Sequence, residues 1–65
     1  MEDHEVEKKV LTDPVFLCAF LANDLVGHFG GKRSAIEHSI GTPAVVLWGL
    51  DTQHQVRITI ERAKA

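Results

Sequence analysis

The chain has 65 residues, a net charge of −2 with neutral histidines and an isoelectric point near 6.0. Its 45% hydrophobic content argues against a disordered chain, and its mild acidity argues against a strong electrostatic grip on DNA or RNA. A chain this short forms one domain, residues 1–65, and buries only about 60% of the surface that its unfolded form exposes. We therefore expect a marginal domain that gains stability from a second subunit.

The cysteine content and the first residues predict a cytoplasmic protein. Cys18 is the single cysteine, so no disulfide can form within the chain, and MEDHEVEKK at the start lacks the apolar core of a signal peptide. The apolar run over 15–22 has eight residues, whereas a membrane span needs about 20. We expect no contact with a membrane.

The N-terminal segment is ambiguous between two structures. Residues 1–5, like residues 63–65, are predicted to be flexible. Over residues 5–11 the four-residue spacing of Val6 and Val10 suits a helix face, while alternation with Glu7 and Lys9 suits an edge strand. A strand here would be the third strand of a sheet.

A long apolar helix is predicted from Asp13-Pro14 to the glycine pair Gly30-Gly31. Asp at the N-cap accepts free N–H groups, Pro at the first helical position needs no donor, and Gly ends a helix at little cost. The first two turns, which include Phe16 and Phe20, are apolar on nearly every side. Such a helix lies between other elements or in a subunit interface, and the short chain favours the interface.

The rest of the chain predicts a short helix and a hairpin. Residues 32–40 read as a second helix, since Ile36 and Ile40 fall on one face and Gly41 follows. Residues 44–50 form an apolar strand in which Gly49 marks a bulge or a close backbone approach. After a turn at 51–54, residues 55–62 alternate, with Val56, Ile58 and Ile60 expected to face the helices.

These elements predict a small α+β domain. A single antiparallel sheet, made of the C-terminal hairpin with or without an N-terminal third strand, would pack on one long and one short helix. A lone hairpin is only marginally stable. The hairpins of two subunits could therefore also pair into one sheet.

Residues 26–33 carry the most specific local motif. A glycine-rich turn followed by Lys32 and Arg33 can offer N–H groups and positive charge to a phosphate. The run Val26-Gly27-His28-Phe29-Gly30, followed by Ile36 and Gly41, resembles the K-homology RNA-binding signature. That resemblance implies a loop between two helices that clamps a nucleic-acid backbone. The alternative is a plain turn between helices whose basic residues are solvated.

The sequence contains candidate residues for a metal site, but no motif for covalent or acid–base catalysis. Asp24 and His28 lie four residues apart, and His38 could join them as metal ligands, although an exposed polar pair at a helix end explains the spacing equally simply. No motif of nucleophilic or carboxylate catalysis is present, and Cys18 lies in the most apolar turn. We expect no enzyme, no cofactor and no bound metal.

The sequence therefore predicts a small non-enzymatic interaction or regulatory module that binds a larger protein. Its size and lack of chemistry are typical of inhibitors made by phages and mobile elements. RNA or single-stranded nucleic-acid binding is the second hypothesis, and metal binding is the third. Self-association, most simply as a homodimer, is assigned to Phe16, Phe20 and Trp48. Partner or nucleic-acid binding is assigned to Gly27, His28, Gly30, Gly31, Lys32 and Arg33.

Overall fold

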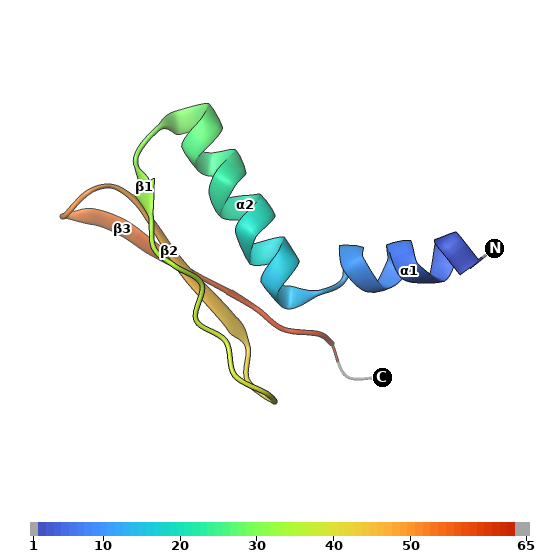
Figure 1. The fold of residues 1–65 in the computed structure, drawn as a ribbon. Helices are drawn as coiled ribbons and strands as arrows, with labels where there is room; N and C mark the ends of the chain where they lie inside the picture. Colours follow the sequence, from blue (N-terminus) through green and yellow to red (C-terminus); the bar gives the residue numbers. More distant parts are fainter. Residues whose placement is uncertain (1, 64–65) are drawn as a thin grey trace.

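The computed structural model describes residues 2–63, with side chains placed from residue 6 onward. Two helices precede a three-stranded antiparallel sheet (Figure 1), which confirms the predicted small α+β fold. The predicted flexibility of residues 1, 64 and 65 lies outside the described range. In chain order the elements are α1 (Glu2–Leu11), α2 (Pro14–Phe29), β1 (Lys32–Arg33), β2 (Ala44–Asp51) and β3 (His54–Ile60).

Helix α2 begins and ends where the sequence predicts. The Asp13 carboxylate accepts the Val15 N–H at 3.4 Å, and Pro14 is the first helical residue. At the other end Gly30 has φ 79°, and its N–H donates to the Val26 carbonyl at 2.9 Å.

Helix α1 settles the ambiguity over residues 5–11 in favour of a helix. It projects away from the rest of the molecule (Figure 1), which leaves Val6 60% and Val10 44% exposed. Arg62 holds its end, because the guanidinium donates to the Thr12 carbonyl at 3.1 Å and to the Lys9 carbonyl at 3.5 Å. The N-terminal segment therefore does not supply the third strand.

The third strand is β1, in the segment where the sequence predicts a second helix, so that prediction is wrong. Lys32 lies opposite Gly49 in the ladder. Further along, Glu37 and Val45 exchange both backbone hydrogen bonds, at 2.8 and 2.9 Å. An extended chain satisfies backbone groups of the central strand β2, which a helix at this position would leave without a strand partner.

The segment after β1 is irregular. Arg33 pairs with Trp48, and the next paired residue, Glu37, pairs with Val45. Between these two pairs the β1 side contains one residue more than β2, and this extra residue interrupts the ladder, as in a β-bulge. The Ser34 hydroxyl fills the gap by accepting the Leu47 N–H at 2.9 Å. Ile36 then packs against the core while Ile40 is fully exposed, which separates the two side chains that a helix would have placed together.

The predicted hairpin is confirmed. Val46 pairs with Ile58 and Trp48 with Val56, and an irregularity between Gly49 and Asp51 matches the predicted bulge. Helix α2 packs across one face of this sheet. Ile58 lies against the core as predicted, as does Ile60. Val56 does not, since 52% of its surface is exposed.

The core between α2 and the sheet is small. Its fully buried members are Cys18, Ala22, Ala44 and Val46, and the partly buried Val15, Ile36, Ile58 and Ile60 surround them. The Cys18 thiol donates to the Ala44 carbonyl at 3.3 Å. Burial raises the pKa of this thiol, which keeps it protonated and unreactive at neutral pH.

Neither helix in the described part of the chain has both the length and the apolar character needed to cross a membrane.

Candidate interaction surfaces

A hollow of about 620 Å³ lies where α2 turns into β1. We call it the β1 hollow. Gly31, with φ 86°, makes the turn, and a Cβ at this position would collide with the Gly49 carbonyl. The close approach of Gly31 and Gly49 brings the start of β1 against the end of β2. The hollow is lined by Gly31, Lys32, Arg33, Ser34, Leu47, Trp48, Gly49, Leu50, Asp51, Thr52 and Gln55.

The β1 hollow combines an apolar lining with two cations. Leu47 and Leu50 are exposed large apolar side chains, and Trp48 is half-buried beside them. Lys32 and Arg33 are both exposed and both line the hollow, and as neighbouring strand residues they point to opposite faces of the sheet. Neither has an ion-pair partner among residues 6–63.

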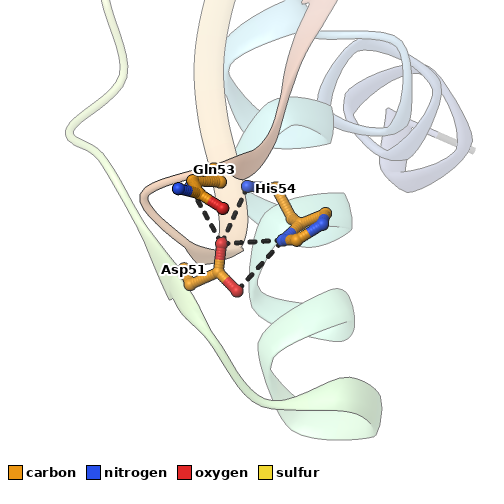
Figure 2. Close-up of polar contacts among 3 residues, drawn as sticks. All are labelled: Asp51, Gln53 and His54. Carbon is orange, nitrogen blue, oxygen red and sulfur yellow. Dashed lines mark hydrogen bonds and ion pairs between the residues drawn. The ribbon is translucent and has the colours of Figure 1, made fainter.

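The one carboxylate that lines the hollow, Asp51, accepts hydrogen bonds within the hairpin turn. Asp51 Oδ1 accepts the Gln53 N–H at 2.8 Å and the His54 N–H at 2.9 Å (Figure 2). His54 Nδ1 lies 2.8 Å from Oδ1 and 3.0 Å from Oδ2. The His54 side chain, followed by the backbone N–H groups, lowers the pKa of Asp51. Asp51 therefore stays ionised, and the two cations Lys32 and Arg33 against this one carboxylate leave the hollow with a positive formal charge.

Trp48 joins the end of α2 to the sheet. Its indole Nε1–H donates to the Gly30 carbonyl at 3.0 Å, and its ring centroid lies 6.4 Å from that of the exposed Phe29. The predicted self-association residue Trp48 thus lies with the predicted partner-binding residues Gly30 to Arg33.

Phe16 and Phe20 lie elsewhere. Their rings are stacked at 6.4 Å with an interplanar angle of 18°, on the side of α2 that faces away from Cys18 and the core. They line a shallow hollow of about 420 Å³ together with Ala19, Asn23 and Asp24. Phe16 and Trp48 lie near opposite ends of a helix that is roughly 24 Å long, so the three predicted residues do not form one surface.

The structure does not contain the loop that the K-homology resemblance implies. Gly27 and His28 lie inside the last turns of α2. Only Gly30 and Gly31 form the turn, and the strand β1 follows them within the described part of the chain. Gly31, Lys32 and Arg33 adjoin the β1 hollow, whereas Gly27 and His28 do not line it.

The residues of the metal hypothesis are not brought together. Asp24 Oδ1 and His28 Nε2 are 3.3 Å apart, and both side chains are more than half exposed. His38 lies instead beside Asp13 and Pro14, at the other end of α2. In residues 6–63 no three His, Cys, Asp or Glu side chains gather as metal ligands would.

A further apolar surface follows α2. Leu17, Leu21 and Leu25 follow one flank of α2, and we call them the leucine row. Leu17 lines a hollow together with Ile60, which places this flank beside β3. Leu21 is 38% exposed. The four-residue spacing was visible in the sequence, but the position of the row beside a sheet edge was not.

Comparisons with family models, with curated proteins and with solved structures find no match to this chain.

Proposed function

We propose that this protein is a small non-enzymatic binding module that acts by occupying part of a larger protein. One observation carries the proposal, namely the imbalance between buried and exposed apolar side chains. Among residues 6–63 only four hydrophobic residues are fully buried, and none is larger than Val46. Large apolar side chains are exposed on both helices and on the sheet, whereas soluble monomers expose few contiguous apolar patches.

The β1 hollow is the contact site in this proposal. An apolar lining with Leu47 and Trp48 suits apolar side chains of a partner, and Lys32 and Arg33 suit its carboxylates. Because β1 lies at a sheet edge, an extended segment can also add backbone hydrogen bonds beside it. The partner is therefore an extended acidic and apolar segment of a larger protein, as for a small inhibitor of phage or mobile-element type.

Affinity capture from nuclease-treated extract of the source cell tests this proposal. We expect the unchanged chain and a Lys9→Glu control to capture the same protein, and the double variant Lys32→Glu/Arg33→Glu to lose it. The interaction is then measured with purified components by calorimetry. If the double variant binds the partner with the same affinity as the unchanged chain, the β1 hollow is not the contact site. If the unchanged chain captures no specific protein, the proposal that it is a binding module is wrong.

Single-stranded nucleic acid is the second candidate. The observation that favours it is the presence of Lys32, Arg33 and Trp48 around one hollow, since cations and an aromatic ring are the groups that bind unpaired strands. Titration of a labelled oligonucleotide at several salt concentrations tests it. Affinity that falls with salt and with the Lys32→Glu/Arg33→Glu change would support this candidate. No detectable binding at low salt would end it.

A further inference from the structure

β3 has a free outer edge. In the strand order β1-β2-β3 only β2 lies beside it, so its other edge has no strand partner among the described residues. The strand runs through seven residues without a proline, and the one irregularity of the hairpin falls outside it, between Gly49 and Asp51. Natural proteins usually protect such an edge with a proline, a bulge or a covering element.

The hydrogen-bond pattern identifies which backbone groups point outward. Val45 exchanges both of its hydrogen bonds with Glu37 on the β1 side, so Val46 directs its own groups toward β3, where Ile58 is its partner. Successive residues alternate in direction along a strand. The N–H and C=O groups of Gln55, Arg57 and Thr59 therefore point away from β2 and into the free edge.

Helix α2 places the leucine row above this edge. Cys18 and Ala22 face the core, and the residue before each, Leu17 or Leu21, is rotated by roughly 100° to the β3 side. The residues after them, Ala19 and Asn23, are rotated to the opposite side and are small or polar. The apolar flank of α2 and the free edge of β3 thus lie on the same side of the molecule.

We propose that β3 pairs antiparallel with β3 of a second copy of this chain, about a two-fold axis at Thr59. The two sheets would then join into one sheet, as in a symmetric isologous dimer. Cross-strand partners share a face, so this register places Arg57 opposite Glu61 of the second copy, twice. Neither Arg57 nor Glu61 has an ion-pair partner within residues 6–63.

The same register continues the apolar face. Ile58 of one copy lies opposite Ile60 of the other, on the side that α2 covers. The leucine rows of the two copies then face each other across the joined strands. A register centred on Arg57 would place the two arginines opposite each other, and charge repulsion disfavours it.

This dimer is independent of the proposed function. The β1 hollow includes one residue of β3, Gln55, near the hairpin turn, whereas the proposed pairing is centred on Thr59 further along the strand, so partner binding and self-association can each fail without the other.

Sedimentation of the full chain tests the proposal. We expect the unchanged protein to sediment as a dimer of the 7.2 kDa chain at micromolar concentration. Arg57→Glu and Glu61→Arg should each weaken the dimer about tenfold, because each creates two like-charge pairs. The double variant Arg57→Glu/Glu61→Arg should restore the affinity. A monomeric unchanged protein, unaffected single variants or an unrestored double variant would each overturn the proposed pairing.

Amide hydrogen exchange gives a second measurement that needs no substitution. The N–H groups of Arg57 and Thr59 should become protected as the protein concentration rises, because only the second copy bonds them. The N–H of Ile58, which faces β2, serves as the control and should be protected at every concentration. Circular dichroism establishes that each charge variant remains folded. Exchange at Thr59 that does not depend on concentration would contradict the dimer.

Discussion

The two outer strands of this sheet present different chemistry to a partner. β1 has two ladder residues followed by an interruption, and its irregular side borders a hollow lined with side chains of both signs and with apolar groups. β3 has seven regular residues and presents mainly backbone groups. An interrupted edge suits recognition by side chains, whereas a regular edge suits pairing with another strand. One small sheet can therefore hold two separate binding surfaces.

Proline substitution on β3 gives the sharpest test of the comparison. Val56→Pro should cost about 3 kcal/mol of unfolding free energy, because it removes an N–H that bonds to β2. Thr59→Pro removes an outward N–H and should cost the monomer about 1 kcal/mol or less. Urea denaturation at low protein concentration measures both. Equal losses would show that the outer groups of β3 are already bonded.

The turn into β1 gives the next largest effect. Gly31→Ala should cost about 2 kcal/mol or more, because φ is positive and the new Cβ would meet the Gly49 carbonyl. Gly27→Ala is the matched control, since nothing lies within 4 Å of its Cβ position and it is helical. It should raise stability by about 0.5 to 1 kcal/mol. Thermal unfolding distinguishes the two opposite signs, and a harmless Gly31→Ala would contradict the described turn.

Both edges depend on β2, whose Ala44 carbonyl accepts the Cys18 thiol. Because burial raises the pKa of this thiol, the unfolded chain ionises first as the pH rises. The folded state then binds more protons, so stability should fall above about pH 8.5. Denaturation at pH 7 to 10 should show this slope, and Cys18→Ala should lack it. A slope of equal size in Cys18→Ala would assign it to another group.

The smallest effect is expected at the turn that joins β2 to β3. Hydrogen bonds from His54 and from the turn lower the pKa of Asp51 in the folded state. The carboxylate therefore stabilises the fold above its unfolded-state pKa of about 4, and this stabilisation is lost as the pH falls through the folded-state pKa. The difference in melting temperature between the unchanged chain and Asp51→Asn should therefore be largest above pH 4 and shrink as the pH falls below it. A difference that does not change with pH would exclude this carboxylate as the cause.

Local signals predicted much of this fold. Asp13, Pro14 and Gly30 set the bounds of α2 through capping chemistry, and the alternation after Gln55 identified β3. Helix and strand patterns fitted Val6 and Val10 equally well, and nothing local could decide between them. The segment after Gly31 was assigned wrongly, because Ile36 and Ile40 have helical spacing while the need of β2 for a second neighbour is a tertiary effect.

The proposed binding surfaces were predicted less completely. Lys32 and Arg33 were identified because charge beside a glycine turn is a local pattern, but the hollow that they border also needs Leu47 and Trp48, more than a dozen residues away. For Arg57 and Glu61, the alternation over residues 55–62 predicts only the side of the strand that faces away from the helices. Their proposed pairing with a second copy depends on which edge of β3 is free. The spacing of residues along the sequence does not predict the order of strands in the sheet.

The position of Trp48 has a practical consequence for spectroscopy. It is the only tryptophan, it borders the β1 hollow, and its indole N–H is held by the Gly30 carbonyl. Its fluorescence therefore reports on the polarity of one surface alone. Occupation of the hollow should shift its emission, while strand pairing at the outer side of β3 should leave the spectrum unchanged, so one optical signal separates the two modes of association without any label.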